Sequence, residues 1–347
     1  MHRYASTFIT GLKKFIGNFI EEKLSNVKIL LLFDGLIVYQ TDTELNKLKK
    51  LRCFNNTFIV LRIFNKLSTA PIYEMLHKIS KDNFIENTIL SNLELGETGK
   101  TFRLIASNEN EFVSINNALR VKIENKIKLV RKLHLNKSKP DIEFWFLYRS
   151  EGYGLFLKRI TSHTAYEKLL ERGELRPELS HILCLMSRPH EHDIFLDPFC
   201  GYGSIPIERS LSFPFNMIFS TDNDLVKIKY IRNKIKNIPI KGTFIPKLQN
   251  ALDLKSFEDN FIHKIVTDPP WGIFEKMDMD ISNFYYLMIQ EFHRVLKREG
   301  IMVILTARKT EFENALVNFS ESLKLTDKYD ILVSGKKAAI YQIVKVQ

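Results

Sequence analysis

Apolar residues near the start of the chain recur every three or four positions, which is the spacing of one helix face. The recurring positions are Leu12, Phe15, Ile16, Phe19, Ile20 and Leu24. A strand-like segment, "KILLLFDGLIVY" (28–39), follows them. The opening stretch is also basic, with no acid before Glu21, as in a targeting segment that is later removed. Because the helical pattern runs straight into a strand pattern, we expect a helix of the first domain.

Two mixed units of strands and helices are predicted before residue 160. Residues 1–66 have the pattern of a strand, a helix, a strand, a turn, a short helix and a strand, which suits a small α+β domain. Residues 67–160 form the second unit. Its expected elements are a helix over 70–80, a strand over 101–107, a helix over 113–127 and hairpin strands over 140–150 and 152–160.

Residues 161–347 alternate between strand and helix patterns, which predicts an α/β domain with a doubly wound, mostly parallel sheet. We expect a helix in each connection between the first six strands. The last two strands are joined only by "SGKK", so a final hairpin adds one antiparallel strand. The expected strands are 193–198, 216–222, 243–249, 263–270, 300–308, 323–333 and 338–347.

The composition is that of a folded globular protein: 45% of the 347 residues are hydrophobic and 26% are charged. A net charge of +11 suggests an anionic partner such as nucleic acid, although an A+T-rich genome would also raise the lysine content. Eleven of the basic residues and only four acids lie between Arg120 and Arg159. This clustering favours a phosphate-facing surface. The candidate RNA-binding residues are Arg120, Lys122, Lys126, Lys128, Arg131 and Lys132.

Cysteine and histidine positions argue against a disulfide framework and a metal site. Cys53, Cys184 and Cys200 lie far apart, which fits a reducing cytoplasm. His190 and His192 lack the spacing of a zinc-binding helix. The longest apolar runs are far shorter than the ~18 residues of a membrane span. We therefore expect a cytoplasmic protein with no metal and no membrane association.

A turn with two glycines, "DPFCGYGS" (197–204), follows the first strand of the third unit. In a doubly wound sheet, ligands bind at the carboxyl ends of the strands, next to the first strand-to-helix turn. Gly201 and Gly203 would let a cofactor contact the backbone, and the start of the next helix would bind a carboxylate. Asp222 ends the second strand roughly 20 residues later, where an acid accepts two ribose hydroxyls.

The third strand ends just before Asn250 and Ala251, which we expect beside an adenine ring. An adenosine that carries a carboxylate describes S-adenosylmethionine better than NAD, because the third glycine of a dinucleotide turn is absent. The candidate cofactor-binding residues are Asp197, Pro198, Cys200, Gly201, Gly203, Asp222, Asn250 and Ala251.

The second informative motif, "DPPWG" (268–272), ends the fourth strand at the same edge of the sheet. Asp268 and the carbonyl of Pro269 could each accept one hydrogen of an exocyclic amine and aim its lone pair at a methyl donor. Trp271 offers a face on which the base stacks. The alternative is a strand end with an ordinary proline turn and a core tryptophan.

With both motifs, the chain resembles the THUMP-domain RNA methyltransferases whose nearest group methylates guanosine N2 in tRNA. Residues 101–123 and 139–160 resemble a THUMP domain, which in that family binds the tRNA 3′ end. Residues 48–64 resemble the closing segment of the ferredoxin-like domain. The resemblance implies a ferredoxin-like domain (1–66), a THUMP-like RNA-binding domain (67–160) and a Rossmann-like class I methyltransferase domain (161–347). "DPFCGYGSIPIE" resembles the family's cofactor motif, whereas the tryptophan of "DPPWG" departs from the family's usual pattern.

The expected activity is S-adenosylmethionine-dependent methylation of guanosine N2 in tRNA. "DPPW" also resembles the motif of adenosine N6 methyltransferases, so adenine in RNA or DNA is an alternative target. A further alternative is an inactive RNA-binding protein that keeps the catalytic fold as a scaffold, but such a protein has no need of the glycines and Asp268. The sequence does not determine the oligomeric state, and a monomer is favoured.

Overall fold

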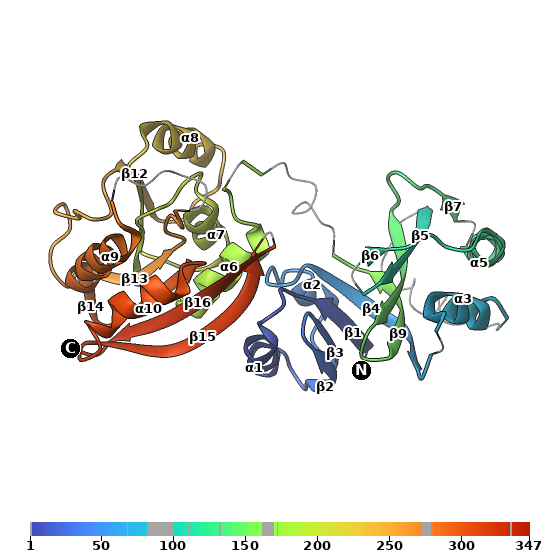
Figure 1. The fold of residues 1–347 in the computed structure, drawn as a ribbon. Helices are drawn as coiled ribbons and strands as arrows, with labels where there is room; N and C mark the ends of the chain where they lie inside the picture. Colours follow the sequence, from blue (N-terminus) through green and yellow to red (C-terminus); the bar gives the residue numbers. More distant parts are fainter. Residues whose placement is uncertain are drawn as a thin grey trace. The chain divides into compact units, whose positions relative to one another are not determined.

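The structure is a computed structural model that describes residues 2–67, 69–81, 100–109, 111–131, 133–161, 170–171, 173–272, 279–333 and 335–347, without the side chains of 130 and 131. The chain divides into two compact units (Figure 1). The first contains Met1–Phe8 and Lys13–Ser162, and the second contains Ile9–Leu12 and His163–Gln347.

The first unit is built on a nine-stranded sheet with the order β2-β3-β1-β4-β9-β8-β5-β6, and β7 also pairs with β5. Its strands are β1 (His2–Thr7), β2 (Lys28–Phe33), β3 (Leu36–Thr41), β4 (Asn56–Asn65), β5 (Thr101–Asn108), β6 (Glu111–Phe112), β7 (His134–Leu135), β8 (Ile142–Arg149) and β9 (Tyr153–Arg159). Its helices are α1 (Lys13–Lys23), α2 (Leu45–Leu48), α3 (Pro71–Lys81) and α5 (Asn117–Arg131).

Most elements expected in this unit are present. The apolar face of α1 is buried through Ile16, Phe19 and Ile20, and β8 and β9 form the expected antiparallel hairpin. α5 begins at Asn117, later than expected, because the side chain of Asn116 accepts a hydrogen bond from a backbone N–H of the first turn. β4 pairs with β9, so one sheet runs through both expected domains. The domain boundary at residue 66 stays a prediction.

The second unit contains a seven-stranded sheet with the order β12-β11-β10-β13-β14-β16-β15. β16 runs antiparallel to both of its neighbours, β14 and β15, as expected for a final hairpin, and the other neighbouring pairs in this sheet are parallel. The strands are β10 (Ile194–Asp197), β11 (Met217–Asp222), β12 (Thr243–Leu248), β13 (Ile262–Thr267), β14 (Leu296–Thr306), β15 (Leu323–Val333) and β16 (Lys336–Lys345). The helices are α6 (Pro177–Met186), α7 (Ser204–Ser212), α8 (Leu225–Ile235), α9 (Ile281–Val295) and α10 (Lys309–Val317).

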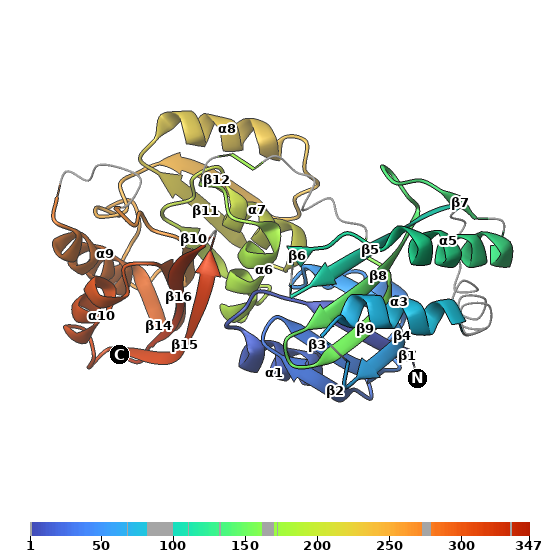
Figure 2. The same ribbon diagram turned by 45° about the vertical axis from the view of Figure 1, so that its right-hand side comes forward.

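Helices cover both faces of this sheet, with α6, α7 and α8 on one face and α9 and α10 on the other (Figure 2). The strand order turns back at β10, because β11 lies on one side of it and β13 on the other. The carboxyl ends of these three strands therefore meet at one edge, which is where a doubly wound sheet binds its ligands.

One expected helix is absent: residues 249–261, between β12 and β13, form turns. Leu254 and Phe257 in this segment are buried in the core. Their carbonyl oxygens accept hydrogen bonds from the guanidinium of Arg294 in α9, and the N–H of Leu254 donates to the Glu291 carboxylate. These α9 side chains satisfy backbone groups that a helix would satisfy internally. The prediction of a helix in this connection was wrong.

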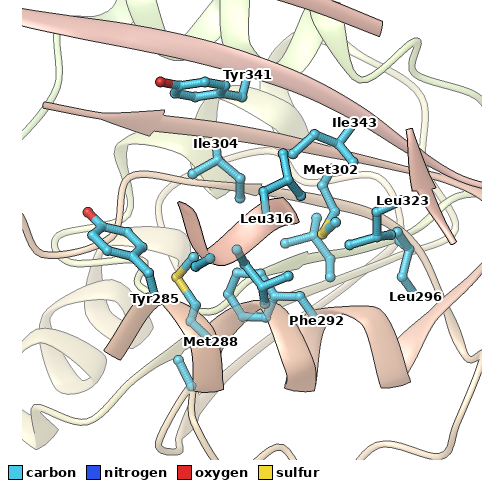
Figure 3. Packing of buried hydrophobic residues seen from close by; sticks show 14 of the residues in the cluster. Tyr285, Met288, Phe292, Leu296, Met302, Ile304, Leu316, Leu323, Tyr341 and Ile343 are labelled. Atoms are coloured by element: carbon cyan, nitrogen blue, oxygen red, sulfur yellow. The ribbon is translucent and has the colours of Figure 1, made fainter. Parts of the chain in front are cut away.

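The main core of the second unit lies between α9 and the strands β14 and β16. Met288 and Phe292 point from the helix toward Met302 and Ile343 (Figure 3). All four side chains are almost completely buried. This layer fixes α9 against the strands that follow the "DPPWG" motif in the chain.

No helix in the described ranges is both long and apolar enough to cross a membrane.

Candidate active site

The glycine turn lies between β10 and α7, and its two glycines differ in what surrounds them. Gly201 and Gly203 both have positive φ angles, +51° and +88°. A Cβ atom at Gly203 would approach Ile207 Cδ1 to 2.9 Å, so a larger residue would have to displace that side chain as well as adopt a strained positive φ. A Cβ atom at Gly201 would meet no protein atom within 4 Å. The backbone at Gly201 therefore faces open space, as a cofactor-binding turn requires.

The carboxylate of Asp222, at the end of β11, holds this turn in place. Its Oδ2 accepts a hydrogen bond from the Gly201 N–H at 2.9 Å, and its Oδ1 accepts one from the Asp224 N–H at 2.9 Å. Lys227 Nζ lies 3.9 Å from Oδ1. Each carboxylate oxygen can accept two hydrogen bonds. Asp222 therefore keeps acceptor capacity for ligand hydroxyls while it fixes the turn.

Asp197, the last residue of β10, has a buried carboxyl group with one unsatisfied oxygen. Its Oδ1 accepts hydrogen bonds from Thr267 Oγ1 at 2.6 Å and from the Phe199 N–H, whereas Oδ2 has no partner among the described residues. Burial, together with the charges of Asp222 and Asp268, raises the pKa of Asp197 to about 8, and the hydrogen bonds from Thr267 and Phe199 oppose that shift. Buried acids this close together suit a positively charged ligand.

The remaining cofactor candidates contribute in different ways. The Cys200 thiol packs against Ile228 and Ile231, away from solvent, and burial raises its pKa. Only the backbone at this position can therefore face a ligand. Pro198 and Ala251 are buried. Asn250 is exposed, and its Oδ1 accepts a hydrogen bond from the Leu252 N–H, which leaves a second lone pair on that oxygen.

The "DPPWG" motif follows β13, the neighbour of β10 on the side away from β11. The indole N–H of Trp271 donates a hydrogen bond to Asp268 Oδ1 at 2.9 Å. Burial raises the pKa of Asp268 to about 7, and the bond from Trp271 opposes that shift. Trp271 therefore fixes the direction of the Asp268 carboxyl group and leaves its Oδ2 for another donor.

Two residues that the sequence analysis missed hold the backbone of this motif. Arg308, the residue before α10, donates from Nε to the Trp271 carbonyl at 2.6 Å and from a terminal nitrogen to the Gly272 carbonyl at 3.4 Å. The hydroxyl of Tyr285 in α9 contacts the Pro270 carbonyl at 3.4 Å and bonds Thr306 Oγ1 at 2.7 Å. The position of Arg308 two residues after β14 was the one signal in the sequence, because that strand ends at the ligand edge.

The RNA-binding candidates of the first unit lie on or just after α5. Lys122 is exposed, Lys126 and Lys128 are half-buried, and Arg120 pairs with Glu124 one turn later at 3.7 Å. The Arg131 side chain and Lys132 lie outside the described part of the chain. The described residues contain no group of three metal-ligating side chains.

Comparison with known proteins identifies the second unit. Residues 165–333 match the family described as "RMKL-like, methyltransferase domain". A "Probable tRNA (guanine(10)-N2)-dimethyltransferase" of Methanothermococcus thermolithotrophicus is 30% identical over 148 residues, which are 42% of this chain and 88% of the relative. A "tRNA (guanine(10)-N2)-dimethyltransferase" of Methanocaldococcus jannaschii is 24% identical over 62% of this chain, and the chain spans 64% of its length.

The fold agrees over the whole chain with the crystal structure of TrmN from Thermus thermophilus. The TM-score is 0.75 at 16% sequence identity, and the match covers 100% of both chains. This likeness confirms the predicted α/β methyltransferase fold, and the relatives confirm the resemblance that the motifs indicated. The chain belongs to the family of tRNA (guanine-N2) methyltransferases with an RMKL-like methyltransferase domain.

Proposed function

We propose that the protein methylates the exocyclic N2 amine of a guanosine in tRNA. The observation that carries the proposal is the Asp268 carboxyl group, which Trp271 holds at the edge where the glycine turn also lies. The names of the relatives support guanine N2 and tRNA as the target. The geometry supports an amine acceptor beside a cofactor turn.

The cofactor of this methyltransferase is S-adenosylmethionine, and the residues at the turn fit it. The open space at Gly201 admits a ligand against the backbone. No side chain caps the start of α7, so its first N–H groups are available to a carboxylate. Asp222 would accept hydrogen bonds from the ribose hydroxyls. Asp197 Oδ2 would accept a hydrogen bond from the cationic amino group. Asn250 and Ala251 would lie beside the adenine.

S-adenosylmethionine supplies an electrophilic methyl group, so the protein has to hold the amine in line and stabilise its developing charge. Asp268 Oδ2 and the Pro269 carbonyl would each accept a hydrogen bond from one of the two amine hydrogens. Trp271 would stack on the base, which has to leave its own stack to reach this edge. Arg308 and Tyr285 keep the motif backbone in place while the base is exchanged.

Residues 67–160 would bind the RNA as a THUMP-like domain and present the target base to the second unit. The basic residues of α5 would contact phosphates. We also propose that the protein acts in the cytoplasm, where its three buried free cysteines stay reduced.

The test is to incubate the protein with unmodified tRNA and isotope-labelled S-adenosylmethionine, digest the RNA and identify the labelled nucleoside by mass spectrometry. Label in N2-methylguanosine supports the proposal. Label in N6-methyladenosine would replace guanine by adenine as the target of the same Asp268 site. Absence of label from all tRNAs, with cofactor binding intact, would contradict a tRNA substrate.

A further inference from the structure

The segment from α8 to the turn after β12 is strongly basic within a nearly neutral unit. Residues 163–347 contain 25 basic and 24 acidic residues, a net charge of +1. Residues 225–252 contain seven of the basic residues and no acid. A genome-wide preference for lysine would not concentrate the charge in this way, so the segment needs an explanation of its own.

Three of these basic residues form one exposed stripe along α8 and the residue that follows it. Ile228 and Ile231 face inward and are fully buried. Lys229, Arg232 and Lys236 are exposed, and their spacing of three and four residues places them on one side of the helix. At 1.5 Å per residue the stripe is about 10 Å long, which is long enough to follow several phosphates of one strand. Figures 1 and 2 show α8 as an outer helix of its unit.

The stripe is not neutralised by neighbouring acids. Two other lysines of the helix have acidic partners, since Lys227 lies near Asp222 and Lys234 pairs with Glu174. In the stripe, by contrast, Arg232 donates to the Pro246 carbonyl and Lys236 to the Asn233 side chain, both uncharged oxygens. Within the described ranges, none of the three stripe residues forms an ion pair. Their positive charge is therefore available to a ligand.

α8 also lies next to the cofactor turn. The ring of Tyr202, between the two glycines, packs edge-on against Tyr230 of α8 at 5.1 Å between ring centres. Lys227, in the first turn of α8, reaches the Asp222 carboxylate. Tyr230 and Lys227 lie on the flank of α8 that faces the turn, whereas the stripe lies on the flank near β12, where Arg232 donates to the Pro246 carbonyl. A polyanion bound along the stripe would therefore run along the β12 edge of the sheet that carries the cofactor turn.

We propose that Lys229, Arg232 and Lys236 form an RNA-binding surface on the catalytic unit that contacts the phosphate backbone of the substrate RNA. The inference rests on the proposed function and adds a second contact surface to that of the THUMP-like domain. Because the contacts are to phosphates, they give affinity and register without base specificity.

The test uses the full-length chain with Lys229→Glu, Arg232→Glu and Lys236→Glu combined. The matched control reverses Lys324, Lys336 and Lys337, three exposed lysines on β15 and β16 at the opposite edge of the same sheet. Binding of a fluorescent tRNA transcript is followed by anisotropy between about 50 and 200 mM salt. We expect at least about tenfold weaker binding by the α8 variant, and a salt slope that is smaller by about two to three. The control should bind like the unchanged protein.

Equal binding by the α8 variant and the unchanged protein would overturn the inference, and so would an unchanged protein that binds no tRNA. A weakened variant supports it only if S-adenosylmethionine binding, measured by calorimetry, stays normal. If S-adenosylmethionine binding is lost, a variant with glutamine at the three positions is used instead. Its tRNA binding should also depend less steeply on the salt concentration than that of the unchanged protein. Methyl transfer is measured separately: binding without transfer by the unchanged protein would contradict the proposed function and leave the α8 comparison valid.

Discussion

The two halves of the active-site edge are held in different ways. On the β10 and β11 side, the Gly201 N–H of the turn donates to Asp222, which ends the neighbouring strand β11 and also accepts a hydrogen bond from the Asp224 N–H. On the β13 side, the motif backbone is bonded by Arg308 and Tyr285, which lie beyond the motif in the chain. The proposed cofactor half is therefore built from neighbouring strand ends, whereas the proposed base half depends on α9 and the start of α10.

This difference separates binding from chemistry. Changes on the β10 and β11 side should alter cofactor affinity. Changes on the β13 side should alter methyl transfer and leave cofactor affinity intact, because their hydrogen bonds end on the "DPPWG" backbone and on Asp268.

The largest effect is expected for Asp268→Asn. The substitution keeps an oxygen for the Trp271 N–H but removes the charge that would stabilise the amine. Single-turnover transfer to tRNA should fall about a hundredfold to a thousandfold. Calorimetry should give an unchanged dissociation constant for S-adenosylmethionine. Loss of cofactor binding in parallel would refute the assignment of Asp268 to the base half.

Asp222→Asn should have the opposite profile. The carboxamide places an N–H₂ group where one backbone N–H now donates, and removes the charge from the proposed ribose site. A loss of about 1.5–3 kcal/mol raises the cofactor dissociation constant roughly tenfold to a hundredfold. Transfer at saturating cofactor should stay near normal. A variant with normal cofactor affinity would remove Asp222 from the cofactor site.

Arg308→Lys tests whether the distant support matters. A lysine cannot donate in a fork to the carbonyls of both Trp271 and Gly272. We expect kcat to fall about tenfold, because a loosened motif holds the amine less well in line. The cofactor dissociation constant and the thermal unfolding temperature should change little. A matched control is Arg298→Lys, at an exposed position, and equal kcat values for the two variants would contradict the support role.

The smallest effect is expected from pH. Asp268 has to be ionised to stabilise the positive charge that develops on the amine, and its pKa is raised to about 7. The rate of transfer should therefore fall as the pH drops through 7, by about fourfold between pH 8 and pH 6.5 for a single ionisation. Asp268→Asn should lack this limb in single-turnover rates. If the rate of the variant falls with pH in the same way, the ionisation belongs to another group.

Those features of the fold that depend on local pattern were predicted correctly from the sequence. Strand and helix periodicity predicted the alternation of the second unit, and the glycines, Asp222 and Asp268 all lie at strand ends, where a parallel sheet gathers them. The exception was the segment between β12 and β13. Its backbone is bonded by Arg294, and no short-range pattern in residues 249–261 indicates a partner 37 to 40 positions away.

Residues that act over long distances in the chain were missed for the same reason. Tyr285 was given no role in the sequence analysis, yet its hydroxyl bonds Thr306 and contacts the Pro270 carbonyl. Thr267 lies in an expected strand and was given no role, yet its hydroxyl donates to Asp197 on the neighbouring strand β10. The bond from the Trp271 indole to Asp268 needed coordinates as well, because the ring had been expected only as a stacking surface.

The position of β16 has a consequence for synthesis on the ribosome. β16 is made after β15 yet lies between β14 and β15 in the sheet. Until β16 has emerged, β14 presents an unpaired edge, and the core lacks Tyr341 and Ile343. The strands of the nascent catalytic unit therefore cannot all join the sheet in the order in which they are translated. Its last-made strand completes the sheet, so we expect the growing chain to need protection from aggregation up to that point.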